Sequence, residues 1–286
     1  MVRVTKDGTI HVRPAILVQF RWYKILLGLF NALKTLGLRR FANRIGFGLY
    51  YLLNYKFRYR IRVVNQNAKL PSPCIMTVNH LSYEDTIIIQ SLNELFWHHH
   101  LSMLLANFNF KRAYTPYIKW VEAISDEGLG ADVVDRMARA IGRGYAIGIW
   151  PEGDFTRTGA VMEGFTGAAR LYLRVNHGSL ESPHLKRTPK VPLLPIFLEG
   201  VYESLGPYAI AKRQQLLTQH GTSKTQWKVI VGTPYFLDCP EHITKASLES
   251  LTAQIQDEIR KLDPLDRPIV SNPLKVRKQA LRNGLV

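Results

Sequence analysis

Apolar and polar positions alternate along this chain with two different periods, and the changes of period predict its strands and helices. Short apolar runs bounded by turn residues predict buried strands at 73–78, 101–105, 145–150, 191–198 and 227–231, and alternation at 57–64 predicts a half-exposed strand. Apolar residues recur at helical spacing in 83–95, 130–143, 165–175 and 246–262. Because strands alternate with helices, we expect an α/β fold with a mixed, mostly parallel sheet flanked by helices.

Two segments near the N-terminus also show helical periodicity. Over 15–34 one face is apolar (Val18, Trp22, Ile25, Leu26, Leu29, Leu33), and over 41–55 a second apolar face holds Phe41, Ile45, Leu49, Leu52 and Leu53. Arg21 and Lys24 interrupt any 18-residue apolar run, so we do not expect a transmembrane span. The pattern predicts an amphipathic two-helix hairpin, residues 1–56, that lies in a membrane interface. The alternative is that both helices cap the core of the following domain.

Positive charge is concentrated at the N-terminal end. The net charge is +16 at pH 7, and residues 1–70 hold 14 Lys or Arg and one acid, which leaves only +3 for residues 71–286. A basic segment attracts either nucleic acid or an anionic membrane surface. These cations lie on helices with wide apolar faces, which favours the membrane, so we expect no nucleic-acid partner.

Composition also bears on location and metal binding. The apolar stretch begins well inside the chain without a clean cleavage site after it, so we expect no secretory signal peptide but a membrane-associated protein on the cytoplasmic face. The two cysteines, Cys74 and Cys239, suggest neither a disulfide framework nor a metal site. In the run 98–100 three histidines are consecutive, and consecutive residues cannot all face one ion from a strand, so no metal is expected.

The first chemistry-bearing block follows the predicted strand 73–78. It reads Asn79-His80-Leu81-Ser82-Tyr83-Glu84-Asp85, with a histidine five positions before an aspartate. A histidine held by a carboxylate is a general base near neutral pH, and it can take the proton of a hydroxyl that attacks a thioester. Ser82 and Asp85 also fit a capping box, with Ser82 as N-cap and Asp85 at N3, and one carboxylate can serve both roles.

A second block follows the predicted strand 145–150. It reads Pro151-Glu152-Gly153-Asp154-Phe155-Thr156-Arg157. Catalytic residues of α/β sheets lie at the carboxyl ends of strands, and both blocks occupy such positions. Read alone, Pro-Glu-Gly is also typical of a simple turn with solvated charges.

Together the two blocks resemble those of the glycerolipid acyltransferases, the family of 1-acylglycerol-3-phosphate acyltransferase. The family's first block, Asn-His-x-Ser-x-x-Asp, is matched at every fixed position. The second, Phe-Pro-Glu-Gly-Thr-Arg-Ser, is matched through Glu152-Gly153, after which Asp154-Phe155 looks like an insertion before Thr156-Arg157. Two weaker blocks follow. Gly164 to Arg170 lacks the family's usual Lys, and 191–196 is a Pro-containing run that fits an edge strand equally well.

The resemblance implies an O-acyltransferase of phospholipid biosynthesis that moves a fatty acyl group from acyl-CoA or acyl-ACP to a hydroxyl of a lysophospholipid. It makes His80 the base and Asp85 its partner, without a metal or redox cofactor. It assigns substrate binding to Asn79, Ser82, Glu152, Gly153, Thr156, Arg157 and Gly167. Asp154 beside a phosphate is unfavourable, so a headgroup other than the commonest one is an alternative.

We therefore expect three parts: the helical hairpin over 1–56, an acyltransferase domain over 57–262 and a basic tail over 263–286, with loops at 177–190 and 265–274. The tail is expected to be solvated or to touch anionic lipid. The altered second block keeps two rival functions open. One is a non-catalytic protein that binds anionic membranes on a diverged acyltransferase scaffold, and the other is an acyltransferase for a different acceptor, such as an amine-bearing lipid.

Overall fold

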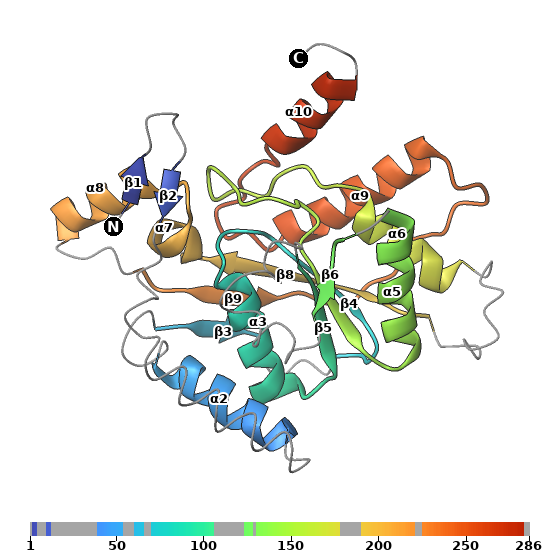
Figure 1. The fold of residues 1–286 in the computed structure, drawn as a ribbon, viewed down its shortest axis with the longest axis horizontal. Helices are drawn as coiled ribbons and strands as arrows, with labels where there is room; N and C mark the ends of the chain where they lie inside the picture. The colour runs from blue at the N-terminus through green and yellow to red at the C-terminus, as the bar shows by residue number, and fades with distance from the viewer. Residues whose placement is uncertain are drawn as a thin grey trace.

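The computed structural model describes residues 2–4, 10–12, 39–53, 60–65, 70–105, 123–127, 130–177, 190–220 and 225–282. Its centre is a seven-stranded sheet with the strand order β3-β9-β8-β4-β7-β5-β6 (Figure 1). The strands are β3 (Arg62–Val64), β4 (Ile75–Val78), β5 (Leu101–Leu105), β6 (Ile124–Ser125), β7 (Ala146–Ile149), β8 (Leu193–Glu199) and β9 (Lys228–Val231). Only the β8–β9 pair is antiparallel, so the predicted mixed, mostly parallel sheet is confirmed.

Helices cover both faces of this sheet. One face carries α3 (Asp85–Leu92), its π-helical continuation Asn93–Trp97, and α7 (Val201–Leu205); the other carries α5 (Gly130–Gly142), α6 (Gly167–Asn176) and α9 (Lys245–Arg260). β4 shows how the strands serve both layers, because successive side chains point to opposite faces. Met76 and Val78 join the core under α3, and Ile75 joins the core under α5, α6 and α9.

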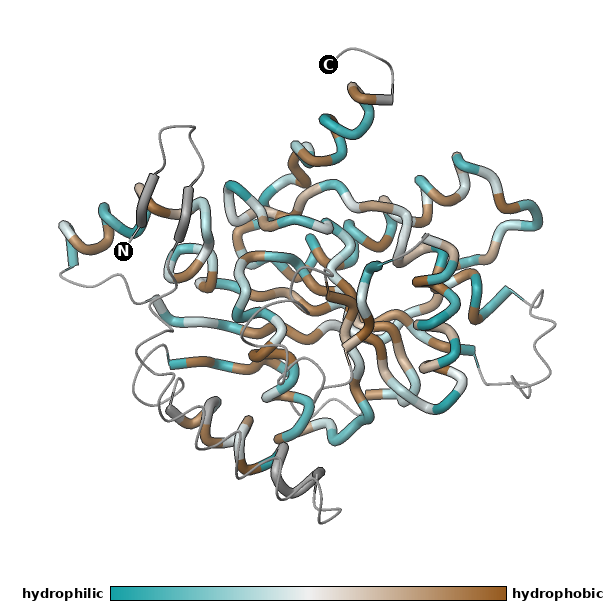
Figure 2. Tube along the Cα trace, in the orientation of Figure 1, coloured by the Kyte–Doolittle hydropathy of each residue, from teal (hydrophilic) through white to brown (hydrophobic). Residues whose placement is uncertain are grey.

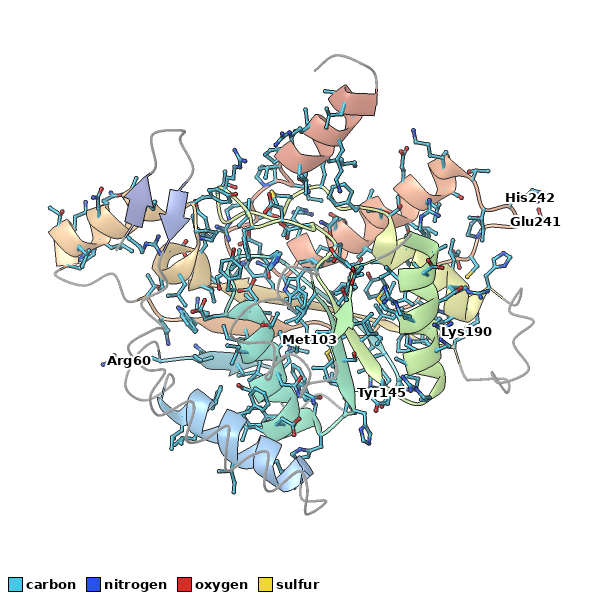
Figure 3. All side chains as sticks on the ribbon, viewed as in Figure 1. Arg60, Met103, Tyr145, Lys190, Glu241 and His242 are labelled. Atoms are coloured by element: carbon cyan, nitrogen blue, oxygen red, sulfur yellow. The ribbon has the colours of Figure 1, made fainter. Side chains whose placement is uncertain are left out.

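Hydropathy follows the same plan. The central strands are the most apolar part of the tube in Figure 2, and hydrophilic and hydrophobic residues alternate along the helices around them. Met103 of β5 is buried near the middle of the molecule, whereas Arg60, Lys190, Glu241 and His242 lie exposed at its periphery (Figure 3). Strands buried on both faces read as continuous apolar runs, which is why the sequence pattern located them.

The second predicted N-terminal helix is present as α2 (Arg39–Leu53), which packs on α3 and its π-helical continuation. Phe47 is buried and Tyr51 meets Phe96 edge-on, with ring centroids 5.9 Å apart. Ile45, Leu49 and Leu52 remain exposed along the outer side. None of the helices in the described ranges combines the length and the apolar character that crossing a bilayer requires. The first predicted helix, 15–34, lies outside the described residues.

Several elements differ from the sequence-based expectations. A two-stranded antiparallel sheet, β1 (Val2–Val4) with β2 (Ile10–Val12), and the helices α8 (Ile210–His220) and α10 (Pro273–Arg282) were not predicted. α10 begins inside the expected loop 265–274 and projects from the body at the top of Figure 1. The alternative that 191–196 is an edge strand is wrong, because β8 lies between β9 and β4. Gly232 leaves room for the ring of Pro195, since a Cβ at Gly232 would lie 2.7 Å from it, and the Gly232 N–H donates to the Pro195 carbonyl.

Candidate active site

The two sequence blocks meet because their strands are neighbours. β4 and β7 pair in parallel, with Thr77 beside Ile149, so the turns that follow them leave the same edge of the sheet. Two direct contacts join these turns. The backbone N–H of His80 donates to Glu152 Oε1 at 3.0 Å, and the N–H of Thr156 donates to the His80 carbonyl at 2.8 Å. The carboxyl edge of a parallel sheet is where α/β proteins place their ligands.

His80 and Asp85 form the pair that their spacing predicts. His80 Nδ1 lies 3.0 Å from Asp85 Oδ2. The Asp85 carboxylate is fully buried and also accepts from the N–H groups of Leu81 (2.6 Å) and Ser82 (3.0 Å) and from the Ser82 hydroxyl (3.0 Å). These bonds satisfy a group that would otherwise be costly to bury, and they hold the imidazole in one orientation. Because Nδ1 faces a carboxylate, Nε2 is the ring nitrogen left to accept a proton.

The predicted capping box forms only in part. α3 begins at Asp85, its N-cap is Glu84, and that side chain makes no capping hydrogen bond. The Ser82 hydroxyl accepts from the Glu84 N–H at 3.1 Å and donates to Asp85. The Ser82 N–H donates to Asp85 Oδ2 at 3.0 Å, which is one half of the box, but the Ser82 hydroxyl accepts from the N–H of residue 84 and not from that of residue 85. Ser82 thus orients Asp85 and contributes nothing to the surface of the site, since its side chain is fully buried.

Asn79 sets the direction in which the chain leaves β4. Its amide donates to the Leu198 carbonyl at 3.0 Å and accepts from the Leu198 N–H at 2.7 Å. These two bonds continue the β4–β8 pairing one residue beyond the strand. Asn79 is fully buried, so its contact with a substrate stays a prediction, whereas its contact with β8 fixes where His80 begins.

Glu152 is a buried support for the His80 turn. Its side chain is fully buried, and that burial raises the pKa of the carboxyl well above its usual value. Glu152 Oε1 accepts from the His80 N–H, and the Glu152 carbonyl accepts from the side chain of Asn272 at 2.7 Å. Of the two roles that the resemblance suggested for Glu152, this geometry supplies the ordering of the site; a contact with an acceptor hydroxyl stays a prediction.

Gly153 is required at the tip of the second turn. Its φ is +65°, a conformation that favours glycine, and an added Cβ would lie 3.0 Å from the ring of Phe165. The Phe165 N–H donates to the Pro151 carbonyl at 2.8 Å, which ties the start of α6 to this turn. Gly167 is the first residue of α6 and is partly buried beside Ile149.

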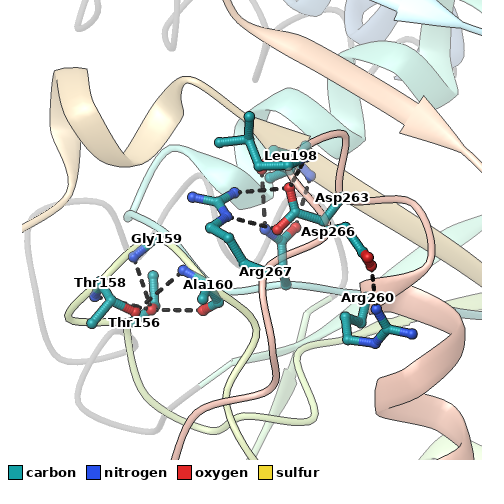
Figure 4. Close-up of polar contacts among 11 residues, drawn as sticks. Thr156, Thr158, Gly159, Ala160, Leu198, Arg260, Asp263, Asp266 and Arg267 are labelled. Atoms are coloured by element: carbon teal, nitrogen blue, oxygen red, sulfur yellow. Dashed lines mark hydrogen bonds and ion pairs between the residues drawn. The ribbon is translucent and has the colours of Figure 1, made fainter.

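Thr156 and Arg157 follow in a tight loop over 156–160 (Figure 4). The Thr156 side chain is fully buried; it donates to the Ala160 carbonyl at 2.8 Å and accepts from the Gly159 N–H at 3.2 Å. Arg157 is exposed, its guanidinium lies 5.0 Å from the centre of the Tyr208 ring, and its carbonyl accepts from the Tyr202 hydroxyl. Thr156 therefore holds the loop together, and Arg157 is the exposed cation of the block.

Sequence reasoning missed Phe155. Its ring lies over the imidazole of His80, with centroids 4.2 Å apart, and meets Tyr83 at 4.6 Å. Trp150 lies on the His80 ring as well, at 5.6 Å. In the sequence Asp154-Phe155 looks like an insertion before Thr156-Arg157, and no pattern indicates that Phe155 returns to contact His80.

Asn272 was missed as well. Its side-chain amide donates to the carbonyls of Glu152 and Glu163, and its oxygen accepts from the N–H groups of Leu274 and Lys275, which caps α10. Asn followed by proline is a helix-start pattern that was available in the sequence. α10 also reaches the site loop through Lys275, 3.6 Å from Glu163, and Lys278, which lies 4.7 Å from the centre of the Phe165 ring.

The described part of the chain offers no group of three His, Cys, Asp or Glu side chains placed to hold a metal ion. What the site does offer is a base. The His80 side chain is 18% exposed, and its Nε2 makes no hydrogen bond with any described residue. An imidazole that is fixed at one nitrogen and accessible at the other is suited to remove a proton from a bound hydroxyl.

Comparison with known proteins identifies the family of this domain. Residues 60–199 match the family model described as Acyltransferase. These residues form an acyltransferase domain. The resemblance to the glycerolipid acyltransferase family is thereby confirmed, and both polar blocks, His80 to Asp85 and Trp150 to Arg157, lie inside the matched range.

The fold of the acyltransferase domain is also found in a solved structure. The crystal structure of the 1-acyl-sn-glycerophosphate (LPA) acyltransferase, PlsC, from Thermotoga maritima matches with a TM-score of 0.54 and 14% sequence identity. The match covers 85% of this chain and 96% of that chain. A search of curated proteins found no match. At this level of identity the likeness establishes a shared fold, and the acceptor and donor remain to be proposed from the site.

Proposed function

We propose that this protein transfers a fatty acyl group from acyl-CoA or acyl-ACP to a hydroxyl of a lysophospholipid, such as 1-acylglycerol-3-phosphate. The single observation that carries the proposal is the His80–Asp85 pair, with Nδ1 held at 3.0 Å by a buried carboxylate and Nε2 bonded to no residue of the described ranges. Its position within the acyltransferase domain supports an acyl group as the cargo.

In the proposed mechanism the acceptor hydroxyl donates a hydrogen bond to His80 Nε2. As its oxygen attacks the thioester carbonyl carbon, Nε2 takes the proton, and Asp85 stabilises the imidazolium that forms. The tetrahedral intermediate then collapses, the carbon–sulfur bond breaks, and the imidazolium returns the proton to the departing sulfur. The products are the ester and the free thiol, and the enzyme is regenerated without a covalent acyl intermediate.

The remaining predicted residues divide by accessibility. Asn79, Ser82, Glu152 and Thr156 have fully buried side chains, so they act by holding the turns that surround His80. Gly153 and Arg157 are exposed and Gly167 is partly buried, so these three are the most accessible members of the set. A guanidinium suits a phosphate oxygen, and for this Arg157 has to leave the Tyr208 ring.

We further propose that the protein works at the cytoplasmic face of an anionic membrane. The exposed residues Ile45, Leu49 and Leu52 share one side of α2, and residues 1–70 carry 14 basic side chains. Apolar residues inserted at the headgroup level, combined with attraction of Lys and Arg to anionic lipids, hold interfacial helices on bilayers. Lysophospholipid acceptors and their products partition into the same interface.

The test is release of thiol from an acyl-CoA by the purified protein in detergent, with and without 1-acylglycerol-3-phosphate, for the wild type and for His80→Ala. Acceptor-dependent release that is lost in the variant supports the proposal. His177→Ala is a matched control, because the His177 ring lies 2.9 Å from the Pro240 carbonyl at the far end of α6 from the two turns. Release that persists in His80→Ala, or no transfer from either acyl-CoA or acyl-ACP to any of a panel of lysophospholipids, refutes it and favours a membrane-binding role.

A further inference from the structure

Aromatic rings form a corner beside the reactive imidazole. Phe155 covers His80 with ring centroids 4.2 Å apart, and Tyr83 meets Phe155 at 4.6 Å with an angle of 66° between the ring planes. Phe155 is half-buried, whereas Tyr83 is 49% exposed. The two rings therefore contact each other at a steep angle: Phe155 lies against the proposed base, and the exposed Tyr83 reaches solvent.

A carboxylate that no cation of the described residues neutralises adjoins this corner. Asp154 is half-buried, and its Oδ1 accepts from the Phe155 N–H at 2.8 Å. No ion pair joins Asp154 to any Lys or Arg of the described ranges. Arg157, three residues away, lies instead over the Tyr208 ring at 5.0 Å. The wall beside His80 thus combines the negative faces of aromatic rings with one unpaired negative charge.

This combination selects the charge of a ligand. A phosphomonoester placed here would lose hydration and meet a carboxylate, both of which are unfavourable. An ammonium group is attracted by aromatic faces, and a nearby carboxylate strengthens that attraction. Recognition of quaternary ammonium groups by aromatic walls is a well-attested use of this arrangement.

We propose that Phe155, Tyr83 and Asp154 bind the ammonium group of the acceptor's headgroup, so that the preferred acceptor is a lysophospholipid with a choline- or ethanolamine-type headgroup. This inference rests on the proposed acyl transfer and names its acceptor class. It also gives a function to the Asp154-Phe155 pair, at which this chain departs from the family pattern.

The experiment compares three acceptors that carry the same acyl chain: 1-acylglycerophosphocholine, 1-acylglycerophosphoglycerol and 1-acylglycerol-3-phosphate. The first two share a phosphodiester and differ in the ammonium, so their ratio of kcat/KM isolates the proposed contact. For the wild type we expect a ratio of roughly 3- to 30-fold in favour of phosphocholine, the range that a cation–aromatic contact supports, with the phosphomonoester as the poorest of the three.

Three variants test the residues. Phe155→Leu keeps an apolar side chain but removes the aromatic face, Asp154→Asn keeps the oxygen that accepts from the Phe155 N–H, and Phe155→Tyr restores the ring. We expect Phe155→Leu and Asp154→Asn to lower the kcat/KM ratio of phosphocholine to phosphoglycerol, and Phe155→Tyr to retain it. For Asp154→Asn the decrease should be about 2- to 5-fold, because a partly exposed charge contributes modestly. A general loss of rate from disturbing His80 cancels in the ratio. Asp135→Asn, at a half-exposed ion pair with Arg174, is the matched control.

A second measurement separates this inference from the proposed function. Without acyl donor no transfer occurs, so titration calorimetry measures the Kd of the protein for the phosphocholine and phosphoglycerol acceptors directly. A Kd ratio that favours phosphocholine and falls in Asp154→Asn supports the ammonium site even if turnover is absent, in which case only the proposed reaction fails. Equal Kd and kcat/KM values for the two acceptors, or ratios unchanged in both Phe155→Leu and Asp154→Asn, overturn the inference.

Discussion

Replacing Asp85 by Asn isolates the contribution of one negative charge to the proposed base. The amide can keep the existing geometry. Its oxygen takes the place of Oδ2 and accepts from the His80 ring and from the Leu81 and Ser82 N–H groups. Its NH₂ group takes the place of Oδ1 and donates to the Ser82 hydroxyl, which can rotate to accept. The tautomer of His80 is thereby preserved. What is lost is the attraction between the carboxylate and the imidazolium that forms during proton transfer.

The size of that attraction follows from the distance. With Nδ1 and Oδ2 3.0 Å apart, the centres of the two delocalised charges are about 4 Å apart, and an effective dielectric constant near 20 gives about 4 kcal/mol. At about 1.4 kcal/mol per tenfold change in rate, kcat should fall by roughly 10³-fold. Exchanging charged for neutral acceptors should lower the free energy of unfolding by about 1–3 kcal/mol, which leaves a folded protein.

The assay is kcat from thiol release at saturating donor and acceptor, with urea unfolding of the same samples as the check on folding. Asp135→Asn is the control for the substitution itself, since its partner Arg174 is a half-exposed surface residue, and it should stay within about twofold of the wild type. The double variant His80→Ala/Asp85→Asn should be no slower than His80→Ala, because the two residues act as one unit. A folded Asp85→Asn protein with kcat within tenfold of the wild type would refute the reasoning.

Three further outcomes are expected. Burial raises the pKa of Glu152 above its unfolded value. The folded state therefore retains this proton to higher pH, and the free energy of unfolding falls as pH rises above about 4.3. In urea titrations Glu152→Gln should gain stability relative to the wild type with rising pH, and parallel pH profiles of the two proteins would contradict this. Gly153→Ala should lower the free energy of unfolding by about 1–2 kcal/mol because of its φ of +65°, and by more because the added methyl would meet Phe165. The control is Gly144→Ala, where φ is +86° and the space around the added methyl is open. Equal losses of stability in the two variants would exclude an effect of the Phe165 contact. Changing Ile45, Leu49 and Leu52 together to Ser should weaken flotation with anionic vesicles by roughly 100-fold, at about 1 kcal/mol per side chain, while Leu217→Ser, at a comparably exposed position on α8, should not.

Much of the molecule was determined by local sequence. Buried strands such as β4 and β7 read as uninterrupted apolar runs, and α5 and α9 carry one apolar stripe, so their existence and type were predicted correctly. The His80–Asp85 pair is local too, because only four residues separate the two side chains and leave few ways to place them. The family resemblance rests on this same short stretch.

The tertiary structure decided everything that depends on strand order. Glu152 supports the His80 turn from 72 residues away, Asn79 is tied to Leu198 across 119 residues, and Asn272 holds the Glu152 carbonyl across 120. No periodicity encodes such contacts, since each arises only when β4 lies between β7 and β8 and the C-terminal segment returns to the same edge. The position of Phe155 over His80 belongs to this class, because a loop residue is placed by the packing around it and not by its neighbours in sequence.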